Sequence, residues 1–331
     1  MATIKDVAKL AGVSTATVSR IINGKGEASE ETIMRVNKVI KELNYKPSSI
    51  AKTLSKKQSN MIALLIPTLS NPFFGELVDC IETAAQNKGY NILLCDSQDN
   101  RDKVNYYIDT MIDHYVVGSI FNSLQVTKED LKRLEDRGIH TITIDRSQFE
   151  HPYTNIKVNN LYGGYIATKH LIDQGCKDII FFSGPEDENS SIERYNGYLL
   201  ALKEKHIVIG DKLVGNFSME SGYLEMQNYI KYGKKFDAVF CANDAMALGV
   251  MAALKDASIK VCHDVKIVGY DNTNYSKYSN PRLTTVSQCK EKIGEIVIDE
   301  LNRINKGGKK MNQIVIEPEL IIRESSIEKE R

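Results

Sequence analysis

Two spacings of apolar residues divide the chain. Up to residue 46, apolar positions recur at helical intervals, whereas from Met61 onward short apolar runs alternate with amphipathic stretches. The runs form two series that read as strands: 62–67, 91–96, 118–122 and 140–145, then 178–183, 212–217, 238–243 and 265–270. Continuous apolar runs separated by helices are typical of parallel sheets that are covered on both faces. The pattern therefore predicts a small all-α unit followed by an α/β unit with two lobes.

The first 46 residues contain start and stop signals for short helices. Thr3 precedes an apolar-periodic run that ends at Gly12, and Ser14 precedes a second run that ends at Gly24. Ser and Thr accept hydrogen bonds from the free backbone N–H groups at a helix start, and Gly readily adopts the left-handed conformation past its end. A third helix is predicted over 29–43. Because a tight glycine-containing turn joins the first two helices, the segment predicts a helix-turn-helix.

The second of these helices has an apolar side and a side of small residues. The apolar side carries Val18, Ile21 and Ile22, and the opposite side carries Thr15, Ala16, Ser19 and Arg20. Short side chains let a helix approach base edges in the major groove, and an arginine at its end can pair with guanine. The candidates for phosphate contacts are Ser14, Thr17 and Ser19. The alternative is a solvent-exposed helix of a small bundle.

The charge distribution favours a polyanion partner for the first unit alone. The 331-residue chain has 43 basic and 43 acidic residues, but residues 1–60 carry 11 Lys and Arg against 5 Asp and Glu. The net charge is therefore +6 for this part and −6 for the remainder. A basic small unit joined to an acidic large one indicates that the small unit binds nucleic acid.

Composition and motifs argue against several other classes of protein. Hydrophobic residues at 42% and charged residues at 26% are typical of a soluble globular protein. No apolar run approaches the roughly 20 residues that span a bilayer, and the N-terminus lacks an apolar signal stretch, so we expect a cytoplasmic protein without membrane contact. The motifs GxGxxG, GxxxxGK[ST] and GxSxG are missing, and the six cysteines and six histidines lack metal-ligand spacing. We therefore expect no enzyme activity, no metal and no cofactor.

Polar and aromatic side chains follow the carboxyl ends of several predicted strands, where ligands gather in open α/β sheets. These residues are Asn71, Phe73, Phe74, Asp145, Arg146, Asn243, Asp244 and Asp271. Aromatic rings stack on the C–H faces of a sugar, and planar Asp, Asn and Arg groups pair with neighbouring hydroxyls. The set predicts a site for a small polyol. The alternatives are a structural ion pair of Asp145 with Arg146, and acids that only cap helices.

The first unit resembles a known family. The run I-K-D-V-A-K-L-A-G-V-S-T-A-T-V-S-R-I-I-N, followed by L-N-Y-K-P-S-S-I-A-K-T-L, is similar to the headpiece and hinge of the lactose-repressor/galactose-repressor family. The resemblance implies that residues 47–55 form a helix on operator DNA, with Leu54 wedged into the minor groove. It also implies that Thr15, Ala16 and Arg20 read bases and that Ala51 and Lys52 lie beside Leu54. The full set of predicted DNA-contacting residues is Thr3, Ser14, Thr15, Ala16, Thr17, Ser19, Arg20, Asn23, Ala51, Lys52 and Leu54. Because so short a segment is not a stable helix alone, a plain linker is the alternative.

The remainder, to about residue 323, is similar to periplasmic sugar-binding proteins and most of all to ribose-binding proteins. Matching stretches include I-A-L-L-I-P-T-L-S-N-P-F-F, T-I-D-R, F-C-A-N-D-A-M-A-L-G and V-G-Y-D-N-T. The resemblance implies a type I periplasmic-binding-protein-like fold and a ribose site made of Asn71, Phe73, Phe74, Asp145, Arg146, Arg194, Asn243, Asp271 and Gln288. Phe73 and Phe74 would sandwich the sugar ring, and the four charged residues would bind hydroxyls. A purine-sensing relative would differ at the Asp145–Arg146 pair, so the resemblance favours a pentose.

These resemblances imply a domain order and a function. The parts are a helix-turn-helix headpiece at 1–46, a hinge and linker at 47–60, and a dimerising sensor at 61–331, with lobes of about 61–159 plus 290–320 and 160–289. The protein would repress an operon for sugar uptake or utilisation. D-Ribose would bind between the lobes, close them, and lower the affinity of a homodimer for its palindromic operator. The alternative is a catabolite-control regulator whose effector is a phosphorylated carrier protein or a phosphorylated sugar.

Overall fold

The computed structural model describes residues 2–24, 28–46, 58–145, 149–309, 311 and 313–327. It divides into two compact units, Met1–Ser59 and Asn60–Arg331, which we call the headpiece and the sensor. The predicted hinge, with Ala51, Lys52 and Leu54, lies outside the described residues, and so does the predicted effector residue Arg146.

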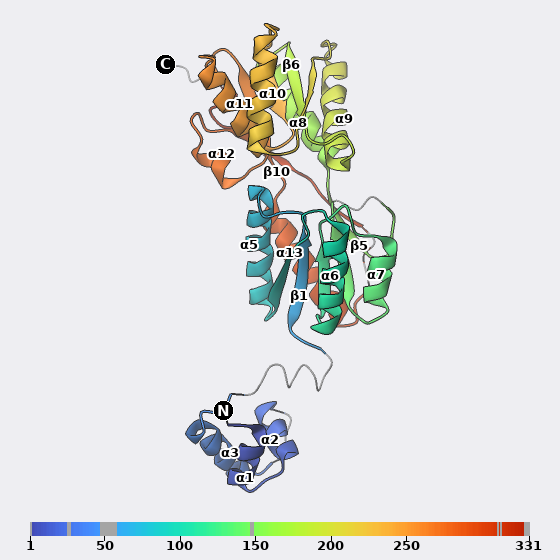
Figure 1. Cartoon of the computed structure of the whole chain (residues 1–331), viewed down its shortest axis with the longest axis vertical. Coiled ribbons are helices and arrows are strands. Elements are labelled where there is room, and N and C mark those ends of the chain that lie inside the picture. Colours follow the sequence, from blue (N-terminus) through green and yellow to red (C-terminus); the bar gives the residue numbers. More distant parts are fainter. Residues whose placement is uncertain are drawn as a thin grey trace. The chain divides into compact units, whose positions relative to one another are not determined.

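The described headpiece residues form three helices that begin where the sequence predicts (Figure 1). These are α1 (Ile4–Ala11), α2 (Thr15–Ile22) and α3 (Glu30–Glu42). The side chains of Thr3, Ser14 and Ser29 each accept a hydrogen bond from a backbone N–H of the first turn, and Gly12 ends α1 at φ 64°. The buried core consists of Val7, Ala8, Ala11, Val18, Val36 and Val39. This core holds α2 with its side of small residues turned outward.

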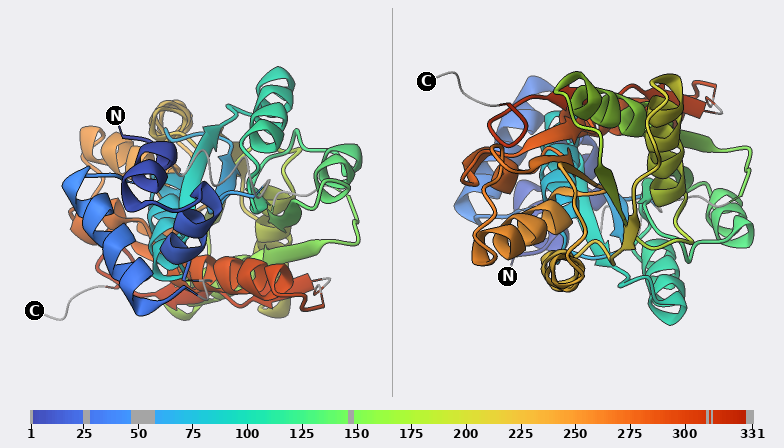
Figure 2. Two further views of the ribbon diagram at one scale, coloured as in Figure 1. Left: turned by 90° about the horizontal axis from the view of Figure 1, so that it is seen from below. Right: turned by 90° about the horizontal axis from the view of Figure 1, so that it is seen from above.

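The first lobe of the sensor is a parallel sheet between two pairs of helices. The strand order is β11-β5-β4-β3-β1-β2. The strands are β1 (Met61–Ile66), β2 (Asn91–Asp96), β3 (Gly118–Phe121), β4 (His140–Ile144), β5 (Thr154–Val158) and β11 (Gln313–Ile316). The helices are α5 (Pro72–Asn87), α6 (Arg101–Asp113), α7 (Lys128–Glu135) and α13 (Lys290–Asn305). Helices α5 and α13 pack together on one face of the sheet, and α6 and α7 cover the other (Figures 1 and 2).

The second lobe repeats this plan with the strand order β12-β10-β9-β8-β6-β7. The strands are β6 (Ile179–Ser183), β7 (Lys212–Val214), β8 (Ala238–Cys241), β9 (Lys266–Asp271), β10 (Thr284–Ser287) and β12 (Glu319–Ile321), the last antiparallel to β10. The helices are α8 (Asn160–Asp173), α9 (Asn189–Glu204), α10 (Met219–Lys231), α11 (Asp244–Asp256) and the short α12 (Asn274–Tyr278). Figure 2 shows the pair α8 and α9 on one face of this sheet and the pair α10 and α11 on the other. The predicted fold class, a helical headpiece with a two-lobed α/β sensor, is thereby confirmed.

Four strands were not predicted from the sequence: β5, β10, β11 and β12. Strand β5 alternates buried and half-buried residues, and β11 and β12 lie at sheet edges with exposed positions, so none of the three has a continuous apolar run. After β11 of the first sheet the chain returns to the second sheet with β12 at Glu319, close to the predicted boundary at about residue 320. In the described part of the chain, no helix combines the length and the apolar character that crossing a bilayer requires.

Candidate functional site: a cavity between the sensor lobes

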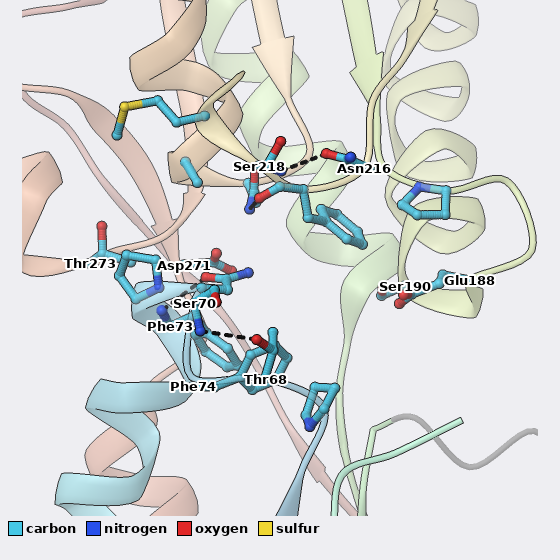
Figure 3. Close-up of a pocket in the computed structure, with 18 of the residues that line it drawn as sticks. Thr68, Ser70, Phe73, Phe74, Glu188, Ser190, Asn216, Ser218, Asp271 and Thr273 are labelled. Atoms are coloured by element: carbon cyan, nitrogen blue, oxygen red, sulfur yellow. Dashed lines mark hydrogen bonds between the residues drawn. The ribbon is translucent and has the colours of Figure 1, made fainter. Parts of the chain in front are cut away.

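A cavity of about 540 Å³ lies between the two lobes of the sensor (Figure 3). Its lining comes from the loops after β1, β2, β3 and β4 of the first lobe and after β6, β7, β8, β9 and β10 of the second. Residues of the helices that follow several of these loops, among them α5 and α9, complete it. In Figure 3, Thr68, Phe73 and Phe74 lie across this space from Asn216 and Ser218. The carboxyl ends of parallel strands meet here, which is where ligands of open α/β sheets bind.

Eight of the nine predicted effector residues line this one cavity. They are Asn71, Phe73, Phe74, Asp145, Arg194, Asn243, Asp271 and Gln288. The ninth, Arg146, lies outside the described residues. The fold therefore brings together side chains that the sequence separates by as many as 217 positions, from Asn71 to Gln288.

Arg194 is held in the second lobe in a way that leaves one terminal nitrogen for a ligand. Its side chain is buried, with 4% relative exposure. Nε donates to Asn160 Oδ1 at 2.9 Å, Nη1 donates to the Ala242 carbonyl at 2.6 Å, and the guanidinium lies 3.7 Å from the centre of the Tyr270 ring. Among the described residues, none accepts a hydrogen bond from Nη2. A fixed guanidinium with a free N–H group suits an oxygen atom of a ligand.

Asn160, at the start of α8, joins Asp145 to Arg194. Its Nδ2 donates to the two carboxylate oxygens of Asp145 at 3.3 and 3.1 Å, and its Oδ1 accepts from Arg194 and from the Tyr270 hydroxyl. Burial raises the pKa of Asp145, while the hydrogen bonds from Asn160 and the charge of Arg194 oppose the rise. Asn160 was not predicted as a site residue because β5, the strand that ends two residues before it, was not predicted from the sequence.

Asp271 ends β9 with a strained backbone. Its φ of 113° lies in a region that residues with a side chain rarely adopt. Gln288 Nε2 donates to Asp271 Oδ1 at 2.6 Å. Burial raises the pKa of Asp271, and the charge of Arg194 opposes this rise whereas the carboxyl of Asp244 adds to it. Strain of this kind persists only where the surrounding contacts fix the backbone, and it is found at ligand sites.

The predicted sandwich of a sugar ring between Phe73 and Phe74 is wrong. The two rings meet edge to face, with centroids 5.2 Å apart and planes at 71°. Because they are neighbours on α5 and touch each other, no ligand ring fits between them. Each ring can still contact a ligand from the cavity floor.

Phe217 contributes an aromatic ring from the other lobe. It follows β7 at φ 64°, and its carbonyl accepts a hydrogen bond from Asn243 Nδ2 at 3.0 Å. The ring packs on Gly184, where an added Cβ would lie only 2.2 Å from it. Phe217 was not predicted as a site residue, although it is the last residue of the predicted strand 212–217.

Asn122 of the first lobe is a second lining residue that was not predicted as a site residue, although it is the last residue of the predicted strand 118–122. Its buried Oδ1 has no hydrogen-bond partner in the described part of the chain.

Two predicted ligand residues are also helix caps. Asn71 Oδ1 accepts from Phe73 N at 3.0 Å, and Asn243 Oδ1 accepts from Met246 N at 2.9 Å. Asn243 uses its amide nitrogen for the Phe217 carbonyl as well, so it shapes the cavity wall. Asp244 does not line the cavity, because the backbone N–H and the hydroxyl of Thr273 bind its carboxylate.

Within the described ranges, no three His, Cys, Asp or Glu side chains lie close enough together to hold a metal ion.

In the headpiece, the residues expected to read DNA bases lie on the exposed side of α2. Thr15, Ala16 and Arg20 are exposed, and Thr17 and Ser19 are half-buried. The hydroxyls of Ser14 and Thr17 are 2.9 Å apart, and Asn23 Nδ2 donates to the Ser19 carbonyl at 2.7 Å. Thr3 lies at the exposed start of α1, where its side chain forms a capping box with Asp6. The geometry leaves one helix face free for a duplex.

Both the headpiece and the sensor match known protein families. Residues 3–48 match the family model described as bacterial regulatory proteins, lacI family, and residues 168–326 match a periplasmic binding protein-like domain. The HTH-type transcriptional repressor PurR of Histophilus somni (strain 2336) is 38% identical over 331 residues, which cover 98% of this chain and 99% of that protein. PurR of Photorhabdus laumondii is 36% identical over 333 residues, covering 99% and 98%.

One solved structure is similar over nearly the whole chain, and another over about four fifths of it. The lac repressor dimer bound to operator and the anti-inducer ONPF is similar with a TM-score of 0.89 at 27% identity, covering 99% of both chains. A LacI family transcriptional regulator from Enterococcus faecium with bound ribose is similar with a TM-score of 0.74 at 26% identity, covering 81% of this chain and 98% of that one.

Proposed function

The chain belongs to the lacI family of bacterial regulatory proteins, and on that premise we propose that it is a transcriptional repressor that D-ribose, or a closely related pentose, releases from its operator. As a member of the family it is a DNA-binding repressor that responds to a small molecule. The exposed face of α2 would read one half-site, and a homodimer would read a palindromic operator.

The chemistry of the cavity lining is the single observation that carries the choice of effector. Arg194 offers hydrogen-bond donors, Asp145 and Asp271 offer acceptors, and the Gln288 carbonyl oxygen accepts no hydrogen bond from the residues that the structure describes. Sugar hydroxyls both donate and accept, so a lining that mixes both kinds suits a polyol better than an apolar or singly charged ligand. The ring of Phe217 supplies a surface for the C–H face of a sugar.

The charge of the lining disfavours the phosphorylated-sugar alternative. Its described residues include four carboxyl groups and one guanidinium, the acids being Asp99, Asp145, Glu188 and Asp271. A phosphate would meet like charge in a partly desolvated space, where repulsion is weakly screened. A neutral pentose avoids that cost.

The comparisons favour two effector classes. The similarity to the regulator that binds ribose supports the pentose. Because the relatives in sequence are named PurR, a purine base is the second candidate. A planar base would use aromatic rings of both lobes, which Phe73 and Phe217 supply, so these rings alone do not separate the two classes. The carboxyl groups of the lining favour a ligand with several hydroxyls, and therefore the pentose.

Calorimetric titration of the full-length protein separates these candidates. We expect saturable binding of D-ribose and none of hypoxanthine, guanine or D-ribose 5-phosphate. Loss of the Arg194 guanidinium in Arg194→Ala should weaken ribose binding by about 10- to 100-fold. The matched control is Arg137→Ala, whose side chain is exposed far from the cavity lining. Binding of a purine base alone would replace the pentose by the purine.

The direction of the response needs a second measurement. A duplex selected by the protein from a random library serves as the operator, and fluorescence polarisation follows its binding with and without saturating ribose. We expect ribose to weaken binding by a coupling of about 1–3 kcal/mol. Tighter operator binding with ribose would make the sugar a corepressor and overturn the release proposed here.

A further inference from the structure

A buried ammonium group joins the two lobes beside the effector cavity. Lys290 begins α13 of the first lobe and has 5% relative exposure. Its Nζ donates to the carbonyl oxygens of Asp271 at 2.7 Å and Asn272 at 2.9 Å, both at the end of β9 in the second lobe. The third neighbour is Glu76 Oε2 at 3.3 Å, on α5 of the first lobe. The ammonium therefore donates two hydrogen bonds to second-lobe backbone and pairs its charge with a first-lobe carboxylate.

Glu76 makes a second connection between the lobes. Its other carboxylate oxygen accepts a hydrogen bond at 2.7 Å from the backbone N–H of Asn274, the first residue of α12. Glu76 lies one helical turn after Phe73, and the Lys290 ammonium lies 5.8 Å from the centre of the Phe73 ring. The ion pair therefore touches the first-lobe wall of the cavity and the second-lobe backbone at the same time.

The backbone that Lys290 holds is strained. Asp271 and Asn272 have φ values of 113° and 51°, both in the region that favours glycine. Such a conformation is retained only while its surroundings fix it. Without the ammonium, a buried and a partly buried carbonyl oxygen would lose their charged donor, and the dipeptide could relax towards ordinary φ values. The Asp271 carboxylate would then turn away from the cavity, although Gln288 still binds it from the side.

We propose that Lys290 is a positioning residue that couples the effector site to the arrangement of the lobes, by fixing the Asp271–Asn272 backbone to Glu76. This inference rests on the proposed function for its effector, but the contacts that carry it involve protein atoms only. The Asp271 carboxylate points into the cavity only while Lys290 and Glu76 of the first lobe keep their contacts with the backbone of residues 271–274 in the second lobe. Loss of the pair should therefore reduce effector affinity and the transmission of binding to the headpiece.

The first test compares Lys290→Met with Lys292→Met in the full-length protein. Methionine is unbranched like the aliphatic part of lysine and lacks the ammonium group, and Lys292 is an exposed residue of the same helix. We expect Lys290→Met to lower ribose affinity by about tenfold or more and to reduce the effect of saturating ribose on operator binding. Lys292→Met should match the wild type in both. Wild-type behaviour of Lys290→Met would overturn the proposal.

A pH profile separates positioning from a general loss of packing. The charged groups that face Asp271 are Arg194 of α9, Asp244 of α11 and Lys290 itself, which lowers the pKa of Asp271. Removing that charge should shift the pH dependence of ribose binding to higher pH. An unshifted profile with reduced affinity would show that Lys290 acts only through packing and would refute the assigned role.

Glu76→Gln provides a second variant if Lys290→Met does not fold. The amide keeps an acceptor for the Asn274 N–H and loses the charge opposite Lys290, so we expect a smaller fall in ribose affinity. In the double variant the two effects should not add, because each removes the same ion pair; additive effects would contradict the coupling.

Hydrogen exchange gives a readout that needs no effector. Lys290→Met should speed amide exchange over residues 271–278 relative to Lys292→Met. If the wild type does not bind ribose, the proposal that ribose is the effector is wrong. The exchange result still tests the role of Lys290, because it does not depend on any effector. Unchanged exchange would remove the physical basis of the inference.

Discussion

A single methyl group added at Gly164 should separate two helices and weaken effector binding. Helices α8 and α9 cross at glycines, and a Cβ on Gly164 would lie 2.1 Å from the carbonyl oxygen of Arg194. Ordinary van der Waals contact begins at 3.4 Å, and the contacted atom is backbone, which cannot swing away as a side chain can. In the Gly164→Ala variant, α9 must therefore move off α8 by roughly 1 Å, because close-packed interiors offer no void to take up the methyl group.

The size of the effect follows from what this movement breaks. Overpacking of a dense core costs about 1–3 kcal/mol in the free energy of unfolding. The hydrogen bond from Arg194 Nε to Asn160 Oδ1 is 2.9 Å long and would lengthen beyond hydrogen-bonding range. A bond to a charged group contributes about 1.5–3 kcal/mol, so misplacing the guanidinium should reduce ribose affinity by about 10- to 100-fold.

Two assays and one control test this reasoning. Urea denaturation measures the free energy of unfolding, and calorimetric titration measures ribose affinity. The control is Gly75→Ala in α5, where an added Cβ has no atom within 4 Å. It should bind ribose as the wild type does and gain up to about 1 kcal/mol of stability. An unchanged affinity in a destabilised Gly164→Ala variant would show that Arg194 does not hold the sugar, and unchanged stability would refute the packing argument itself.

Three further predictions concern pH, DNA and the aromatic wall. Burial raises the pKa of Asp271 from 3.8 to about 7, so the folded state binds this proton more tightly than the unfolded state. The free energy of unfolding should therefore rise as pH falls from about 7 to about 4, by up to ~1.4 kcal/mol per pH unit from this group, and Asp271→Asn should remove that contribution. The prediction is contradicted if the free energy of unfolding, measured by urea titration, changes equally with pH in the wild type and in Asp271→Asn. Arg20→Ala should weaken specific operator binding by about 1–3 kcal/mol and leave ribose affinity unchanged; an equal loss on an unrelated duplex in polarisation assays would show a phosphate contact instead. Phe217→Ala should lower ribose affinity by about 2- to 10-fold. Gly184→Ala, whose Cβ would lie 2.2 Å from the Phe217 ring, should reproduce that loss in calorimetry, and wild-type affinity in both variants would exclude Phe217 from the site.

Features that depend on neighbours along the chain could be predicted from the order of residues. Thr3, Ser14 and Gly12 begin or end helices through backbone groups within a few residues of them, so their effect is visible in the sequence. The apolar runs predicted eight strands because a strand buried on both faces needs consecutive apolar residues. Ligand residues at strand ends were also within reach, because the carboxyl ends of parallel strands always meet at one edge. That rule, with the family resemblance, placed eight predicted residues in one cavity.

The contacts that hold those residues in place became visible only in the folded chain. Asn160 binds Arg194 across 34 positions, and Lys290 binds the Asp271 backbone across 19, with no local signal at either residue. The edge-to-face contact of Phe73 with Phe74 likewise depends on side-chain packing that the pattern of residue types does not specify. The physical reason is that hydrogen bonds and packing between lobes depend on where the crossovers bring the chain back. The sequence pattern therefore predicts which side chains lie at each strand end, and the folded lobes determine the distances between those side chains.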